Sequence, residues 1–246
     1  MIFNLLNDGF SVQSLMYVIY FVTVFLITIT IHECAHGYVA YKMGDPTAAA
    51  MGRLTLNPVK HMDIVGTIVI LVIGFGWAKP VPINPRNFRN PKAGMAISAA
   101  AGPISNILMA MLGVIIYRII WLMIIKAELY EFDMVSGSFT INSIANSAQE
   151  FFGTFYTLNL WFAVFNLIPI PPLDGSRIVS YFLPPRLYHQ YNYLERYGFI
   201  ILILMLNMDR FGFRGFNLIS GLQTVAGWIL SLINFIIDPV FKIFGG

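Results

Sequence analysis

Two histidines and a glutamate stand together in the stretch "IHECAHGYVA", residues 31–40. If this stretch is helical, His32 and His36 lie about 40° apart on one helix face, one turn from each other along the axis. At this spacing two imidazoles can bind the same metal ion. Glu33 lies about 100° around the helix from His32, where it can act on a water molecule without being a ligand. Cys34, about 200° from His32, is expected to point away. The spacing predicts one Zn²⁺ per chain, with Glu33 as a catalytic base.

The residues before this stretch strengthen the metal interpretation. The run from Gly9 to Ile31 carries no charge and is long enough to cross a bilayer, which needs about 20 apolar residues. Ionisable side chains at membrane depth cost at least about 2.5–3.5 kcal/mol each. Three such groups together need a compensating partner, and a bound cation supplies one.

A catalytic zinc ion normally has three protein ligands, so the two histidines need a third. The candidates are His61, Asp63, Glu150, His189 and Asp174. Asp174 is the best of them. It follows three prolines in "NLIPIPPLDGSRI", residues 166–178, which are expected to break a membrane span and let a short helix restart. We expect Asp174 to cap that helix, and a simple cap without a metal is the alternative.

The composition places these residues in an integral membrane protein, since 57% of the 246 residues are hydrophobic and only 11% are charged. Uncharged runs of spanning length cover Gly9 to Ile31, Ala93 to Tyr117, Phe151 to Leu173 and Gly215 to Ile237. Two shorter runs, Ile64 to Ala78 and Tyr197 to Met208, are compatible with tilted spans, re-entrant segments or half-helices. We therefore expect an all-α membrane protein with about four to six transmembrane helices, formed by residues 1–246 as a single polytopic domain.

The basic residues are distributed unevenly between the predicted spans. The region from Lys42 to Lys92 carries seven bases against two acids, namely Lys42, Arg53, Lys60, Lys79, Arg86, Arg89 and Lys92 against Asp45 and Asp63. The region from Lys126 to Glu150 is acidic instead. Because cytoplasmic loops are enriched in Lys and Arg, the first region is predicted to be cytoplasmic and the second outside. This orientation puts the predicted metal site of a multi-pass cell-membrane protein near the cytoplasmic side.

A proline-rich connector, "GWAKPVPINPRNFRNP", covers residues 76–91. Proline interrupts helical hydrogen bonding and favours an extended conformation in the residue before it. We expect an extended or re-entrant segment near the cytoplasmic face, and an ordinary loop facing lipid headgroups is the alternative.

Small and polar residues recur every fourth position in the run that begins at Ala93: Gly94, Ser98, Gly102 and Asn106. They form one helix face, and small residues permit close packing of membrane helices. Packing alone would explain the stripe. Asn106 is also a polar group that could hydrogen-bond a substrate carbonyl or a developing oxyanion.

Together, four segments resemble the site-2 protease family of intramembrane zinc metalloproteases, in its short bacterial form without a PDZ or CBS domain. They are "HECAHGYVA", "GRLTLNPVKHMDIVGTI", "AAGPISN" and "NLIPIPPLDGSRI". The resemblance implies that His32, His36 and Asp174 hold zinc, that Glu33 is the catalytic base and that Asn106 lies near the substrate. It also implies hydrolysis of peptide bonds within or beside the transmembrane segment of a membrane-protein substrate. His61 and Asp63 match a family segment without a role that the sequence defines.

Two other classes of protein are alternatives to a protease. A zinc transporter would also bury His and Asp, but it would not need Glu33 and is expected to repeat ligands along a path across the membrane. An inactive, substrate-holding relative would usually lack the base or a ligand. The expected partners are the lipid bilayer and a membrane-protein substrate, with no nucleic acid, and no oligomeric state follows from the sequence.

Overall fold

The computed structural model describes residues 11–73, 76–133, 138–208 and 217–243. Four long helices make up most of it: α2 (Val12–Lys42), α5 (Pro91–Lys126), α6 (Ser143–Asn166) and α10 (Leu218–Ile243). The shorter α-helices are α3 (Thr47–Ala50), α4 (Ile64–Ile73), α7 (Asp174–Phe182), α8 (Pro185–Tyr193) and α9 (Gly198–Leu206), and the 3-10 turns are η1 (Pro58–Lys60), η2 (Pro85–Asn87) and η3 (Leu194–Arg196). The described part is thus mainly helical.

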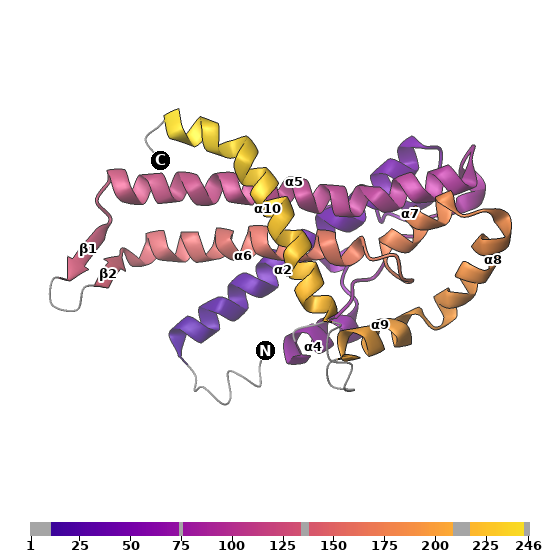
Figure 1. Ribbon diagram of the computed structural model, residues 1–246, viewed down its shortest axis with the longest axis horizontal. Coiled ribbons are helices and arrows are strands. Elements are labelled where there is room, and N and C mark those ends of the chain that lie inside the picture. Colours follow the sequence, from indigo (N-terminus) through magenta and orange to yellow (C-terminus); the bar gives the residue numbers. More distant parts are fainter. Residues whose placement is uncertain (1–10, 74–75, 134–137, 209–216, 244–246) are drawn as a thin grey trace.

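Helices α5 and α6 run side by side and are joined at one end by an antiparallel hairpin (Figure 1). The hairpin strands are β1 (Tyr130–Asp133) and β2 (Ser138–Ile141), with Tyr130 opposite Ile141. Helix α2 packs against both long helices, and α10 crosses them (Figure 1). The short helices α7 and α8 follow α6 toward the opposite end from the hairpin, and α9 returns toward the start of α10 (Figure 1).

Within the described ranges, three helices, α2, α5 and α10, are long and apolar enough to cross a membrane. The predicted run Ala93 to Tyr117 lies within α5, whereas α2 continues beyond the predicted Ile31 to Lys42 and so carries the histidines. The predicted run Phe151 to Leu173 begins within α6, but this helix ends at Asn166. The first two residues of the predicted runs at Gly9 and Gly215 lie outside the described residues.

The two shorter apolar runs form short helices rather than spans of full length. Helix α4 has 10 residues and α9 has 9. At about 1.5 Å per residue, helices of this length reach only about half of a hydrocarbon core roughly 30 Å thick.

Polar side chains define where the long helices begin. Ser11 accepts a hydrogen bond from the N–H of Ser14 at the start of α2, and Asn90 accepts one from Ala93 at the start of α5. Asn142 caps α6 in the same way. These side chains satisfy N–H groups that have no partner within the helix.

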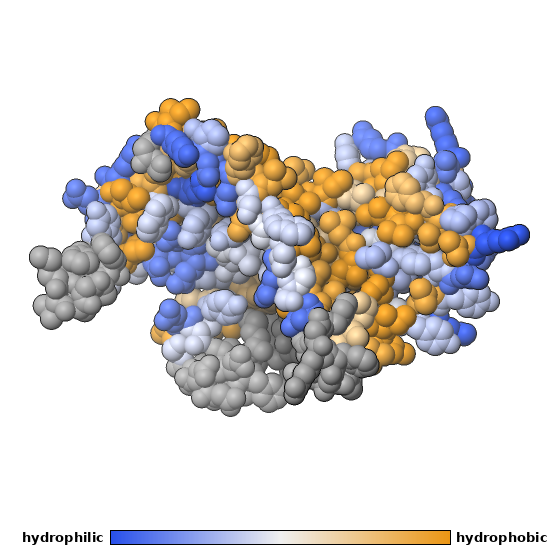
Figure 2. Space-filling view, viewed as in Figure 1, coloured by the Kyte–Doolittle hydropathy of each residue, from blue (hydrophilic) through white to orange (hydrophobic). Residues whose placement is uncertain are grey.

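Apolar side chains fill the contacts between the helices and also cover much of the exterior. One core cluster joins Ala110 and Val114 of α5, Leu160 of α6, and Ile233 and Ile237 of α10. Figure 2 shows hydrophobic residues over the central part of one face and hydrophilic residues toward both ends. An apolar exterior of this kind fits a protein surrounded by lipid.

The proline-rich connector is fixed to the loop that follows α2. The backbone N–H of Lys79 donates to the carbonyl of His61, and the Arg53 guanidinium donates to the carbonyls of Lys79 and Pro80. The Asp45 carboxylate accepts hydrogen bonds from the Asn84 N–H and the Asn87 amide. Burial alone would raise the pKa of Asp45, but these bonds and those from Thr47 outweigh it and lower the pKa.

Candidate metal centre

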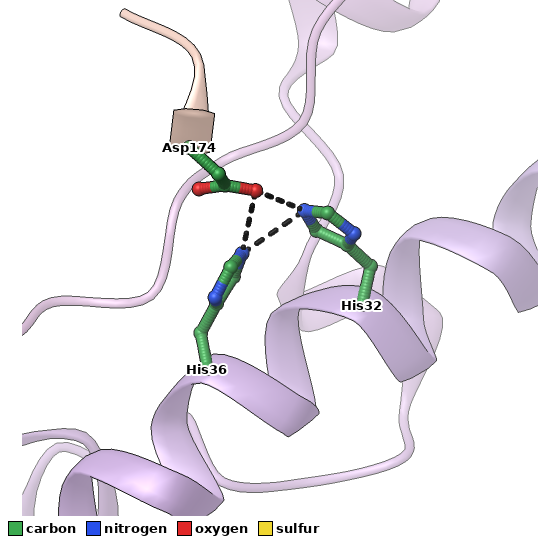
Figure 3. Close-up of side chains that lie close together, drawn as sticks. All are labelled: His32, His36 and Asp174. Atoms are coloured by element: carbon green, nitrogen blue, oxygen red, sulfur yellow. Dashed lines mark hydrogen bonds and ion pairs between the residues drawn. The ribbon is translucent and has the colours of Figure 1, made fainter. Parts of the chain in front are cut away.

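Three side chains from two separate helices converge near the C-terminal end of α2 (Figure 3). Nε2 of His32 lies 3.0 Å from Nε2 of His36. Oδ2 of Asp174 lies 3.1 Å from the first nitrogen and 3.2 Å from the second. Both histidines are buried, and the carboxylate is mostly buried. Among the described residues, these are the three His, Cys, Asp or Glu side chains whose ligand atoms gather closely enough to hold a metal ion.

The arrangement fits a zinc ion. With tetrahedral bonds of about 2.0–2.1 Å, neighbouring ligand atoms are about 3.3 Å apart, close to the separations observed here. His36 Nδ1 lies 2.7 Å from the carbonyl oxygen of Ser98, which can only accept a hydrogen bond. In the neutral ring Nδ1 therefore carries the proton and Nε2 keeps its lone pair. Apart from the two imidazoles, the buried Oδ2 of Asp174 has no polar partner in the described part of the chain.

The local sequence explains how Asp174 reaches the histidines. Helix α6 ends at Asn166, and the following segment contains the three prolines that interrupt the helix. Leu173 takes the N-cap position of α7, and Asp174 is the first helical residue, with no side-chain capping hydrogen bond. The prediction that Asp174 caps this helix is therefore wrong, because its carboxylate turns toward α2 instead.

A glycine makes this turn possible. A Cβ atom at Gly175 would lie 2.3 Å from the carbonyl oxygen of Leu167 and 2.5 Å from that of Ile168. Only a residue without a side chain fits so close to the backbone at the end of α6. This contact places the residue next to it, Asp174, against the C-terminal end of α6.

The predicted stripe of small residues on α5 lies against the histidines. All four of its members, Gly94, Ser98, Gly102 and Asn106, are buried. A Cβ at Gly102 would lie 2.4 Å from Cε1 of His36 and 2.5 Å from Cε1 of His32. Three of the four do more than allow close packing, since Ser98, Gly102 and Asn106 contact the two rings. Gly94 packs against Phe88 instead.

Asn106 lies on the far side of the His32 ring from Asp174. Its Oδ1 is 2.6 Å from His32 Nδ1, and its Nδ2 donates to Asn159. The residue is only 1% exposed. This geometry favours a role in orienting His32 over the predicted contact with substrate.

Glu33 does not belong to the cluster of three ligands, as its position on the helix predicts. Its Oε2 accepts a hydrogen bond of 2.7 Å from the backbone N–H of Val81, in the proline-rich connector. Cys34 also turns away, and its thiol donates to the carbonyl of Thr55. The base candidate is thus held by a backbone group that no side-chain pattern could have indicated.

The other residues considered as a third ligand lie elsewhere. His61 is fully buried with Nε2 2.8 Å from the Thr55 carbonyl, and Asp63 accepts a hydrogen bond from the Gly66 N–H in the first turn of α4. Glu150 accepts a bond from the Asn146 amide on α6, and His189 is exposed on α8. His61 and Asp63 therefore fix the fold of the loop between α2 and α4.

Sequence reasoning missed two polar residues in the interior of the helices. Thr28 on α2 and Asn159 on α6 are fully buried and hydrogen-bonded to each other. Both lie within runs that were read only as uncharged. A polar side chain inside a membrane span is itself a signal of a partner, and it could have identified them.

Comparisons with known proteins point to one family of metal-dependent proteases. Residues 20–206 match the sequence model of peptidase family M50. A Bacillus subtilis protein named "Putative zinc metalloprotease YwhC" is 39% identical over 198 residues, which are 80% of this chain and 84% of that protein. Proteins named "Putative zinc metalloprotease Rip2" from Mycolicibacterium smegmatis and Mycobacterium tuberculosis are 28% and 26% identical, over 80% of this chain and 71% of each relative. No solved structure matches the chain.

Proposed function

Because the chain belongs to peptidase family M50, we propose that it is an intramembrane zinc metalloprotease that hydrolyses peptide bonds within or beside the transmembrane segment of a membrane protein. One observation carries the proposal. The ligand atoms of His32, His36 and Asp174 converge within 3.2 Å of one another, and two of them belong to a helix long and apolar enough to cross a membrane.

Zinc is the cofactor, as the family and the names of its relatives indicate. Held by His32, His36 and Asp174, it would polarise the scissile carbonyl and bring the pKa of the attacking water toward about 7. Glu33 then takes the proton from this water and delivers it to the leaving amine. Its Oε2 already accepts a hydrogen bond from the Val81 N–H, which holds the carboxylate in place.

The immediate surroundings of the ligands keep the site rigid. The Ser98 carbonyl and the Asn106 amide hold the outer nitrogens of His36 and His32, and Gly102 fits directly against both rings. Outer hydrogen bonds of this kind fix the ring orientation and increase the basicity of the ligating nitrogen.

We place the reaction near the cytoplasmic side of the cell membrane. The histidines lie in the C-terminal part of α2, and the connections that follow carry most of the basic residues of the first half of the chain. Lys and Arg favour cytoplasmic loops. Cleavage at this depth would release the cytoplasmic part of a membrane-anchored substrate, which is the outcome of regulated intramembrane proteolysis.

The test compares membrane proteomes of cells that carry the wild-type protein or the Glu33→Gln variant. Cytoplasmic fragments of membrane proteins, ending within or beside a span, should appear only with the wild type. Equal fragments in both cells would refute the proposal. A second experiment measures zinc transport and substrate cleavage by the purified protein in liposomes. Zinc transport without cleavage would favour the alternative of a zinc transporter.

A further inference from the structure

We propose that Asn159 on α6 is a positioning residue for the metal site, and that it acts by fixing the orientation of the Asn106 amide. Asn106 in turn determines which nitrogen of His32 carries the proton, and so whether Nε2 presents its lone pair to the metal position beside Asp174 and His36. This inference rests on the zinc site of the proposed function. By this inference α6, which supplies no ligand, affects zinc affinity through Asn106 and His32.

A continuous line of buried hydrogen bonds joins α6 to the metal site. Asn159 Nδ2 donates to the Phe155 carbonyl over 2.8 Å and to the Thr28 hydroxyl over 3.1 Å. Asn159 Oδ1 accepts from Asn106 Nδ2 over 3.1 Å, and Asn106 Oδ1 lies 2.6 Å from His32 Nδ1. Thr28 and Asn159 are 0% exposed, Asn106 1% and His32 5%.

The Phe155 carbonyl determines which group donates and which accepts in the bonds that lead from Asn159 to His32. The Phe155 carbonyl is a backbone oxygen and can only accept, so Asn159 must turn its NH₂ group toward it. Asn159 then directs its Oδ1 toward Asn106, and the NH₂ group of Asn106 must donate to this oxygen. This leaves the oxygen of Asn106 facing His32, whose Nδ1 must carry the proton. The lone pair of His32 is thereby placed on Nε2.

Without Asn159, nothing in this line would prevent the Asn106 amide from turning over. An NH₂ group would then face His32 and favour the other tautomer, with the proton on Nε2, where it would oppose metal binding. His36 does not depend on a chain of side-chain hydrogen bonds, because its Nδ1 lies against the backbone carbonyl of Ser98. The outer nitrogens of the two ligands are therefore fixed by different means: that of His36 by a backbone carbonyl, and that of His32 by side chains of α5 and α6.

The first experiment measures the zinc affinity of the purified protein by competition with a chelator. The Asn159→Leu variant should bind zinc about 10–100-fold more weakly than the wild type, the usual effect of losing an outer partner of a histidine ligand. Gln149→Leu is the matched control. It removes another buried amide from α6, about 15 Å along the helix, and should leave zinc affinity unchanged.

A gentler variant guards against a simple folding defect. In Asn159→Ser the hydroxyl can still donate to the Phe155 carbonyl, four residues earlier, but it is too short to accept from Asn106. It should fold as the wild type does and bind zinc about 10–100-fold more weakly. Unchanged zinc affinity in either folded variant would overturn the inference.

Testing Asn159→Leu in an Asn106→Asp variant distinguishes an effect on the orientation of the residue 106 side chain from an effect on helix packing. In Asn106→Asp both oxygens are acceptors, so His32 meets an acceptor whichever way the side chain turns. Adding Asn159→Leu to this background should lower zinc affinity less than about threefold, against about 10–100-fold in the wild-type background. An equal loss in both backgrounds would show that Asn159 acts only by packing. Because zinc is measured separately from cleavage, a wild-type protein that binds zinc but cuts no membrane protein would refute the proposed function while leaving this inference intact.

Discussion

The backbone N–H of Val81 donates a hydrogen bond of 2.7 Å to Oε2 of Glu33. Val81 stands between Pro80 and Pro82, neither of which has an N–H group. The bond therefore ties the base candidate to the one donor that the backbone of this short stretch offers. It also links the loop that contains the prolines to the helix that carries both histidines.

The Glu33→Gln variant should retain about one zinc ion per chain and lose at least about 100-fold in cleavage rate, the lower end of what a general base contributes. Glutamine keeps an oxygen that can accept from Val81, so the local fold is expected to survive. Zinc content by metal analysis and cleavage of a membrane substrate check the two halves of this prediction. Loss of zinc from the folded variant would instead make Glu33 a ligand.

Asp174→Asn tests the third ligand. A residue that only began a helix would tolerate this change, because Asn and Asp are similar at helix N-termini. A zinc ligand would not, since the amide lacks the charge that binds the metal. We expect the variant to lose zinc and activity together, whereas Asp63→Asn, at the start of α4, should keep both. Full zinc content in Asp174→Asn would leave this residue a structural role only.

Gly102→Ala should weaken zinc binding through sterics alone. The added Cβ would lie within about 2.5 Å of both imidazoles, so the rings must move. Overpacking of this kind costs about 1–3 kcal/mol, which corresponds to roughly 5–150-fold in affinity. Gly153→Ala on α6 is the control, because its Cβ would approach only Tyr117, at 3.6 Å. Equal zinc affinity in the two variants would mean that the rings are not held against α5.

The parts of the site that follow from local geometry could be predicted from the sequence. The four-residue spacing of His32 and His36 has one structural meaning on a helix, and the structure places both on the same face. The position of Glu33 outside the ligand cluster follows from the same helical geometry. Three of the four long apolar runs likewise overlap α2, α5 and α10, whereas the fourth, Phe151 to Leu173, extends beyond the end of α6 at Asn166.

The parts that depend on distant segments could not be predicted with the same certainty. Asp174 was the best of five candidates, but its turn away from the helix cap depends on the contact of Gly175 with the end of α6. Asn106 could equally have faced a substrate or a histidine until the crossing of α2 and α5 was known. The Val81 N–H has no side-chain signature at all. Sequence spacing describes one helix, whereas these contacts join different ones.

The orientation of the chain can be tested with single cysteines in a Cys34→Ala background. Arg89 precedes α5 among the basic residues, and Ser143 begins α6 after the hairpin, and both are exposed. An impermeant maleimide added to intact cells should label Ser143→Cys but label Arg89→Cys only after permeabilisation. The Cys34→Ala protein alone should remain unlabelled. The reverse pattern would move the metal site to the outer side of the membrane.

Substrate selection should depend on how easily the substrate helix unwinds. A peptide carbonyl in an intact helix is engaged in a hydrogen bond with the N–H four residues later and is not presented to an attacking water. Breaking such bonds in lipid costs several kcal/mol for each unsatisfied group. Spans with Gly, Pro or Asn in their cytoplasmic third have already lost part of that stability. We therefore expect them to be cut faster than spans with good helix formers at the same depth.

The measurement uses one cleavable membrane substrate in which these residues are replaced by Leu, with Leu substitutions in its outer third as the matched control. Because His32 and His36 lie in the last part of α2, near the predicted cytoplasmic side, only the cytoplasmic substitutions should slow cleavage. Since Gly is about 1 kcal/mol less favourable than a good helix former within a helix, each Gly→Leu change should slow cleavage by up to about fivefold. Mass spectrometry of the products locates the cut. Unchanged rates, or cuts gathered at the outer face, would show that unwinding near His32 and His36 does not govern which proteins are cleaved.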